Sequence, residues 1–196
     1  SYNYSNIVTA ISNAKITADS TLVLQQDVSF GGTITTSNSG VIDSLNNIGL
    51  TIDLNGHTLT YEGTRDAFQV QGTDKFLTLV DNSETGGGSL VTDSANSAVC
   101  TSNGSTGAHI TIGEGVTVKG LALISGTDAT LDVYGTIDTT ELTATDNGQS
   151  YSVPAVQTNG SYTINSSINL YDGAVVQSDS HAIYHPGTGT LNVYDG

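Results

Sequence analysis

One stretch of alternating residues decides the fold of this chain, and it reads GLTIDLNGHTLT at positions 49–60. Apolar and polar side chains alternate on both sides of Asn55-Gly56, which is the pattern of two short half-buried strands joined by a tight turn. Such a small unit cannot bury its own apolar face. We therefore expect it to stack against copies of itself.

Comparable segments return about every 28 residues along the chain. Each passes from an alanine-centred apolar segment through a glycine into a Leu/Ile-x-Leu/Val/Ile strand that ends in a turn. The spacing is irregular, which suits a coil whose turns vary in length and argues against helical repeats with fixed loops. The alanines that mark the copies are Ala67, Ala98, Ala122, Ala155 and Ala182.

Each copy holds three short strands, because a further apolar segment follows the closing glycine turn. Val116-Thr117-Val118, for example, follows Gly113-Glu114-Gly115. Three-stranded copies that share one continuous interior form a parallel β-helix. The sequence therefore predicts an all-β fold, a single solenoid of about six to seven rungs with three short strands per rung.

The two ends of the chain differ from the middle. Apolar residues at helical spacing over 6–14 predict a short amphipathic helix that shields the first rung. Residues 21–24 and 27–30 are expected to be entry strands, so we assign 1–30 to an N-terminal cap and 31–196 to the β-helix. Gly196 falls where earlier copies enter their third strand. We expect an uncapped last rung there, which is continued in a longer solenoid or covered by another chain.

The chain resembles the right-handed parallel β-helix domains of the pectate-lyase-like superfamily, especially bacterial surface and adhesin-like members. The resemblance depends on the expected capping helix, on TLVLQQDV at 21–28 and on LTIDLNGHTLT at 50–60, and it covers essentially the whole chain. It implies a right-handed coil. It does not imply one function, because lyases, hydrolases, phage tailspikes and adhesins share this scaffold.

The composition is acidic, with 4 Lys and Arg against 19 Asp and Glu and a net charge of −15. Nucleic-acid binding needs basic residues that neutralise phosphates, so we exclude nucleic acid as a partner. No segment reaches the roughly 18 consecutive apolar residues of a membrane helix, and we expect no membrane insertion. An acidic, Thr- and Asn-rich composition is typical of bacterial solenoids that are secreted or displayed, which predicts an extracellular or cell-surface location.

Strand alternation predicts which side chains point away from the core. Two outward columns follow from aligning the copies. The first, the polar column, contains Thr51, Thr78, Thr111, Asp132, Asn169 and Asn192, and the second contains Asp53, Val80, Gly113, Tyr134, Tyr171 and Tyr194.

The three tyrosines of the second column form the best candidate for a binding surface. Rungs lie about 4.8 Å apart, so Tyr134, Tyr171 and Tyr194 are expected to form an external ladder about 10 Å long. A broad apolar face with a polar tip suits sugar rings or a partner's surface, although rings that only stack on one another are the structural alternative. With their polar neighbours, the predicted ligand-binding residues are Tyr134, Tyr171, Tyr194, Asp132, Asn169 and Asn192.

The sequence identifies no catalytic residue. The resemblance implies that a lyase would place a basic residue beside Ca²⁺-binding carboxylates, but neither outward column contains Lys or Arg. A glycoside hydrolase needs two carboxyl groups about 5–9.5 Å apart, and alternation does not pair Asp53 with Asp132. The acids at 128, 138, 141 and 146 crowd one region, which is more typical of a solvated face.

No metal or cofactor is expected either. His181 and His185 lie about 13 Å apart on an extended strand, too far to share one ion. His57 and His109 flank turns and have no expected companion. Aspartates beside glycines are interpreted as turn residues rather than Ca²⁺ ligands. Cys100 lies in a repeat strand and is expected to be a packed thiol.

Three functions of different kinds remain. The first is a non-catalytic surface solenoid that binds a glycan or a cell-surface protein, as adhesins do. The second is a structural spacer that assembles through its uncapped C-terminal rung. The third is a polysaccharide-active lyase or hydrolase. An exposed tyrosine ladder favours the first function, end-to-end association the second, and paired carboxylates in a groove the third.

Overall fold

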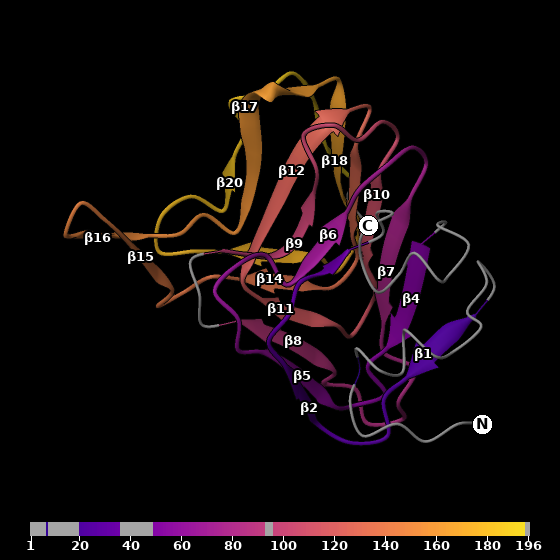
Figure 1. Cartoon of the computed structure of the whole chain (residues 1–196). Helices are drawn as coiled ribbons and strands as arrows, with labels where there is room; N and C mark the ends of the chain where they lie inside the picture. Colours follow the sequence, from indigo (N-terminus) through magenta and orange to yellow (C-terminus); the bar gives the residue numbers. More distant parts are fainter. Residues whose placement is uncertain (1–6, 8–19, 36–48, 93–95, 195–196) are drawn as a thin grey trace.

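The computed structural model describes residues 7, 20–35, 49–92 and 96–194. Nearly all of the regular structure in these residues is strand (Figure 1). Of the helix expected over 6–14, only Ile7 lies within the described residues. Its side chain is buried against the core. Within the described part of the chain, no helix is long and apolar enough to cross a bilayer.

The first sheet consists of seven parallel strands, and the segment that opened the sequence analysis contributes its second strand. The strand order is β1-β4-β7-β10-β13-β18-β21, so every neighbour comes from the next turn of the chain. The strands are β1 (Thr21–Val23), β4 (Gly49–Asp53), β7 (Phe76–Val80), β10 (His109–Ile112), β13 (Thr130–Val133), β18 (Ser166–Leu170) and β21 (Gly189–Val193).

The second and third sheets contain six parallel strands each and are built in the same way. The second sheet contains β2 (Val28–Phe30), β5 (Thr58–Tyr61), β8 (Ser89–Thr92), β11 (Thr117–Lys119), β14 (Thr136–Asp138) and β19 (Val175–Gln177). The third sheet contains β3 (Ile34–Thr35), β6 (Phe68–Val70), β9 (Ser97–Thr101), β12 (Leu121–Thr127), β17 (Val156–Ile164) and β20 (Ile183–Tyr184).

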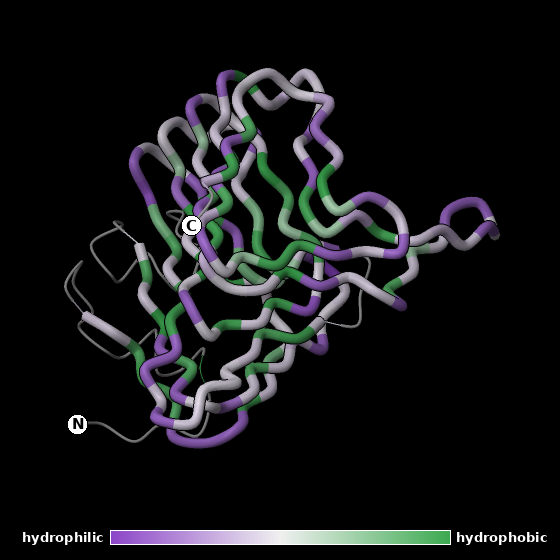
Figure 2. The backbone as a smooth tube through the Cα atoms, turned by 180° about the vertical axis from the view of Figure 1, so that it is seen from behind, coloured by the Kyte–Doolittle hydropathy of each residue, from purple (hydrophilic) through white to green (hydrophobic). Residues whose placement is uncertain are grey.

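The chain visits the three sheets in turn, so three strands complete one rung and the fold is a parallel β-helix. Six complete rungs and one further strand, β21, are present in the described residues, which confirms the predicted architecture. The expected entry strands are β1 and β2, and they pair in parallel with β4 and β5 of the next rung. Figure 2 shows hydrophobic residues recurring at equivalent places in successive turns.

The core consists of columns of aliphatic side chains that follow the rungs. In one column Leu50, Leu77, Ile110, Leu131 and Ile168 are aligned by strand pairing and are at most 2% exposed. Each such side chain contributes about 1.5–3 kcal/mol through burial. The inward side chains are no longer buried at β21. There Leu191 is 45% exposed, and Val193, in the neighbouring column, is 69% exposed.

Aspartates fix the turns between the first and second sheets. Asp53 accepts hydrogen bonds from the backbone N–H groups of Asn55 and Asn82, and Asp81 accepts them from Gly56, Ser83 and Gly88. Although partial burial alone would raise the pKa of Asp81, these hydrogen bonds, with that from Gly88 first, hold it below its usual value. Asp53 and Asp81 therefore stabilise the turns through hydrogen bonds to backbone N–H groups.

An insertion between β14 and β17 interrupts the regular coil. It contains the antiparallel hairpin of β15 (Thr143–Asp146) and β16 (Gln149–Ser152), which projects to the left in Figure 1. Its base packs Leu142, Ala144 and Val153 against Leu121 and Leu123 of β12, on the outer side of the third sheet. The insertion thus has a small hydrophobic cluster of its own.

Candidate functional site

The candidate site lies on the outer face of the first sheet, where the strand register aligns side chains from successive rungs. The pairing places Thr51, Thr78 and Thr111 in one line, which continues through Asp132, Asn169 and Asn192. The second column continues one position past the strands. The backbone N–H of each tyrosine in this column donates to a carbonyl of the preceding rung. Tyr134 donates to Ile112, Tyr171 to Val133 and Tyr194 to Leu170. Both predicted columns are therefore present.

The three tyrosines form a continuous stack, which we call the tyrosine ladder. The ring centroids of Tyr134 and Tyr171 lie 4.1 Å apart with planes 6° from parallel, and those of Tyr171 and Tyr194 lie 4.9 Å apart at 14°. Tyr134 is 37% exposed and Tyr194 is 49% exposed. The ladder has the predicted spacing and remains open to solvent.

The stacking decides which parts of the rings can meet a ligand. Each inner ring face is covered by the neighbouring ring, so a ligand reaches the ring edges, the hydroxyl groups and the two terminal faces. Ring edges carry partial positive charge and phenol groups form hydrogen bonds in both directions. The expectation that sugar rings lie on the tyrosine faces thus applies only to the ends of the ladder.

A chain of hydrogen bonds runs beside the ladder in the polar column. The Nδ2 group of Asn169 donates to Asp132 Oδ1 over 2.7 Å, and the Nδ2 group of Asn192 donates to Asn169 Oδ1 over 2.8 Å. At the other end, His109 Nε2 lies 2.7 Å from Asp132 Oδ2. Asp132 is therefore held on both carboxylate oxygens, and the column presents amide and imidazole groups in fixed positions.

The sequence-based expectation that His57 and His109 have no companion is wrong. His109 pairs with Asp132, and His57 Nδ1 lies 3.4 Å from Asp27 Oδ1. Both partners come from neighbouring rungs, 23 residues away for His109. A pattern read within one copy of the repeat cannot show such contacts, because the register between copies creates them.

The charge of Asp132 also reaches the tyrosine ladder. A hydrogen bond with the Tyr134 side chain, together with partial desolvation and the nearby carboxylate of Asp132, raises the pKa of Tyr171 to about 12. The Tyr171 phenol is therefore neutral at physiological pH and remains available for hydrogen bonding.

Of the residues considered for catalysis and metal binding, Asp138 and Glu141 border one pocket on the second sheet, whereas the others are dispersed. Asp53 accepts turn hydrogen bonds in a different column from Asp132, and Asp128 accepts a hydrogen bond from Asn165 Nδ2 over 2.6 Å. His185 contacts Thr158, and His181 contacts Ser180. In the described ranges, no three His, Cys, Asp or Glu residues come together as metal ligands.

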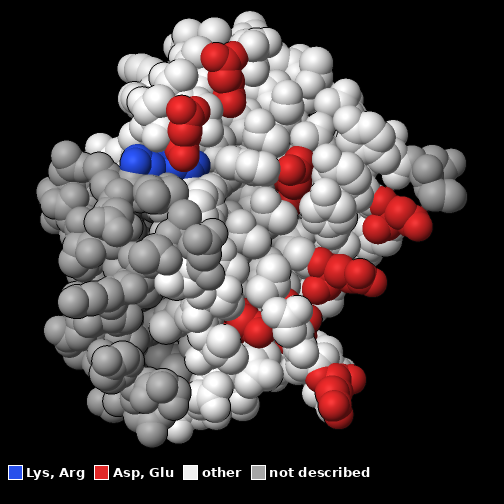
Figure 3. Space-filling view, turned by 90° about the vertical axis from the view of Figure 1, so that its right-hand side faces the viewer, with Lys and Arg blue, Asp and Glu red and all other residues white. Residues whose placement is uncertain are grey.

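On the face of the molecule in Figure 3, the acidic residues of the described surface are spread rather than concentrated. Figure 3 views the side of the molecule that includes β1, β4 and β7, and most of its described surface is neither acidic nor basic. The acids stand singly or in small groups, and one group of basic atoms lies beside two of them. A face of this kind favours ligands without a large charge of either sign.

The comparisons with known proteins identify no relative: no family model, no curated protein and no solved structure matches the chain.

Proposed function

We propose that this protein is a non-catalytic, extracellular binding module that recognises a neutral glycan along the outer face of its first sheet. The observation that carries the proposal is the pairing of an exposed tyrosine ladder with a hydrogen-bonded amide column across the same three rungs. The two columns run in parallel along the solenoid axis. They suit an elongated ligand that lies along that axis.

The chemistry of the two columns supports a polyhydroxylated ligand. Tyrosine hydroxyls, Asn169 and Asn192 supply donors and acceptors side by side, while the ring edges supply apolar contact area. Asn169 and Asn192 lie on strands, and the tyrosines directly follow strands and are stacked on one another, so little conformational freedom is lost when a ligand binds. The net charge of −15 repels polyanions, and we therefore assign a neutral rather than an acidic glycan.

The test is a glycan array probed with the wild-type chain and with the variants Tyr134→Ala, Tyr171→Ala and Asn169→Ala. Each of these three substitutions is expected to weaken glycan binding by about tenfold or more, which corresponds to roughly 1.4 kcal/mol of binding free energy. Tyr162→Ala is the matched control, because Tyr162 is 60% exposed on β17 and belongs to neither column. Binding that is absent, or that all four variants retain equally, would contradict the proposal.

A second candidate function is self-association, and it depends on a different observation. The inward-facing Leu191 and Val193 of β21 are largely exposed, whereas the aligned Ile168 of the preceding rung is fully buried. A second copy of the chain that covers these side chains would bury apolar area and pair with β21, the last strand of the first sheet in the described residues. Sedimentation of the wild type and of the double variant Leu191→Ser/Val193→Ser tests self-association. The wild type is expected to associate and the double variant to remain monomeric. A wild type that stays monomeric at high concentration contradicts this candidate function.

A further inference from the structure

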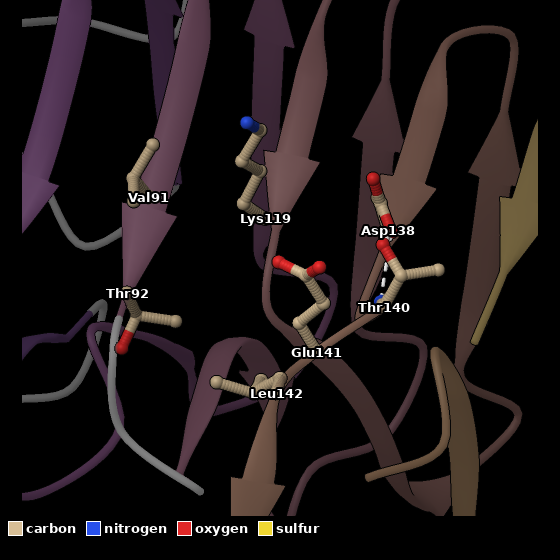
Figure 4. Close-up of a pocket in the computed structure, with 7 residues that line it drawn as sticks. All are labelled: Val91, Thr92, Lys119, Asp138, Thr140, Glu141 and Leu142. Atoms are coloured by element: carbon tan, nitrogen blue, oxygen red, sulfur yellow. Dashed lines mark hydrogen bonds between the residues drawn. The ribbon is translucent and has the colours of Figure 1, made fainter. Parts of the chain in front are cut away.

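A pocket of about 270 Å³ lies on the second sheet, away from the tyrosine ladder. Its floor comes from neighbouring strands, since Val91 of β8, Lys119 of β11 and Asp138 of β14 are aligned by strand pairing. Its wall comes from the insertion, through Thr140, Glu141 and Leu142. Figure 4 shows the Glu141 carboxylate between Lys119 and Asp138, with the Lys119 side chain extended away from Glu141 so that its ammonium lies at the far end. Sequence analysis placed Asp138 and Glu141 in one acidic region but interpreted it as a solvated face, because only the insertion, packed beside the repeat strands, brings them to a pocket with Lys119.

The fold holds the Asp138 carboxylate and the backbone that carries Lys119 and Glu141. Lys119 and Asp138 project from adjacent strands, and Asp138 Oδ1 accepts hydrogen bonds from both the N–H and the hydroxyl of Thr140. The Glu141 N–H donates to Asp179 Oδ2 over 2.8 Å, and its backbone has a left-handed φ of 65°. Leu142 is anchored in the cluster with Leu121 and Leu123.

Opposite charges face this pocket without neutralising each other. Among the described residues, neither the Lys119 ammonium nor the Glu141 carboxylate has a partner within ion-pair distance. Partial burial alone would raise the pKa of Asp138, but the hydrogen bonds from Thr140, with smaller effects of Gln177 and Lys119, hold it below its usual value. One positive and two negative charges therefore line the site at neutral pH.

We propose that this pocket binds a small zwitterion of the α-amino acid type, with the ligand carboxylate on Lys119 and the ligand ammonium on Glu141 and Asp138. A simple anion would be attracted by Lys119 and repelled by two carboxylates, and a simple cation would be attracted by the two carboxylates and repelled by Lys119, so each would suffer at least one repulsion. A zwitterion matches both charges at once. Val91 and Leu142 offer apolar contact for a short side chain, and the volume suits a ligand of that size.

Titration of glycine, L-alanine and L-lysine into the isotopically labelled full chain, followed by amide NMR shifts, tests the proposal. At least one of them is expected to bind saturably, with a Kd below about 1 mM and with shifts centred on Val91, Lys119, Asp138 and Glu141. Acetate and methylammonium, each carrying only one of the two charges, are expected to give no saturable shift at the same concentration. Saturable binding of either single-charge ion at these residues, or no binding of any zwitterion, overturns the proposal.

Substitutions separate this pocket from general charge effects. Lys119→Met keeps the side-chain stem and removes the charge, and Glu141→Gln keeps the shape; each is expected to weaken binding at least about tenfold. Lys75→Met and Glu114→Gln make the same changes in charge outside the pocket and are expected to leave the Kd unchanged. Equal weakening by pocket and control variants would show a nonspecific effect and overturn the assignment. The tyrosine ladder takes no part in this readout, so the glycan proposal stands or falls separately.

Discussion

Tyr134 and Tyr171 lie ring on ring, 4.1 Å apart and within 6° of parallel, although 36 other residues separate them in the chain. Strand register alone brings them together, because Tyr171 donates its backbone N–H to Val133, the residue before Tyr134. The stack is thus a direct product of the coil. Its stability and its ionisation behaviour should report on the outer face of the first sheet.

The tyrosine ladder should weaken at alkaline pH. Because the pKa of Tyr171 is raised to about 12, the folded state favours its neutral form. This contribution is fully present below the ordinary tyrosine pKa of about 10 and is lost as the pH rises through about 12. Tyr134→Phe removes the hydrogen-bond partner and should return the pKa of Tyr171 toward 10, which ultraviolet titration of tyrosinate measures. Tyr151→Phe, on the hairpin, is the control, and identical titration curves for both variants would contradict the prediction.

Loss of a core side chain should cost far more in the middle of the solenoid than at β21. Leu131 and Leu191 belong to the same column, but Leu131 is fully buried and Leu191 is 45% exposed. Leu131→Ala is expected to lower the free energy of unfolding by about 2–5 kcal/mol, and Leu191→Ala by less than about 1 kcal/mol. Urea denaturation followed by circular dichroism gives both values. A similar loss in the two variants would show that Leu191 is covered in solution.

Acid should destabilise the turns that Asp81 holds. Its pKa is lowered in the folded state, so its contribution is present above the unfolded value of about 3.9 and is lost as the pH falls through the folded value. Asp81 is partly exposed, and the effect is expected to be about 1 kcal/mol at most. Asp81→Asn should be less stable than the wild type at pH 7 and should lose less stability on acidification, as measured by urea midpoints. Asp146→Asn, on the hairpin, should behave like the wild type.

The thiol of Cys100 should be unreactive in the folded protein. Its thiol is buried, and burial together with the charge of Asp66 raises its pKa well above the usual value. An aromatic disulfide reagent at pH 8 is therefore expected to react slowly with the native chain and rapidly in denaturant. Reaction at the same rate in both conditions would mean that β9 opens readily.

The strands and the two outward columns could be predicted because alternation and turn residues are local signals that every copy repeats. The segment 49–60 alone defines two strands and the turn between them, and alignment of the copies then gives the register. The positions of Tyr134, Tyr171 and Tyr194 followed directly from this. Cys100 is buried, as expected of a packed thiol, although it aligns with Gln69 and Leu123 on the outer side of the third sheet.

Contacts that depend on distances between rungs could not be predicted. The pairing of His109 with Asp132 needs the direction of each side chain, which alternation does not supply. Alternation likewise left open whether the tyrosine rings stack on one another or offer their faces to a ligand. The pocket of Lys119 and Glu141 arises because the insertion folds back over the third sheet and its first residues reach the second. An insertion has no second copy in the chain, so no internal comparison could reveal its path.

The succession of paired rungs also determines how the protein should respond to tension. Each rung contacts its two neighbours, so a pulling force applied through the chain ends would detach one turn at a time rather than the whole body at once. In the described part of the chain, β21 would detach early, because its inward side chains Leu191 and Val193 are 45% and 69% exposed. Tyr194 would then leave the stack before Tyr171 and Tyr134. The protein would therefore unfold under force one rung at a time, and the detached rungs could refold onto the remaining coil when the force is removed.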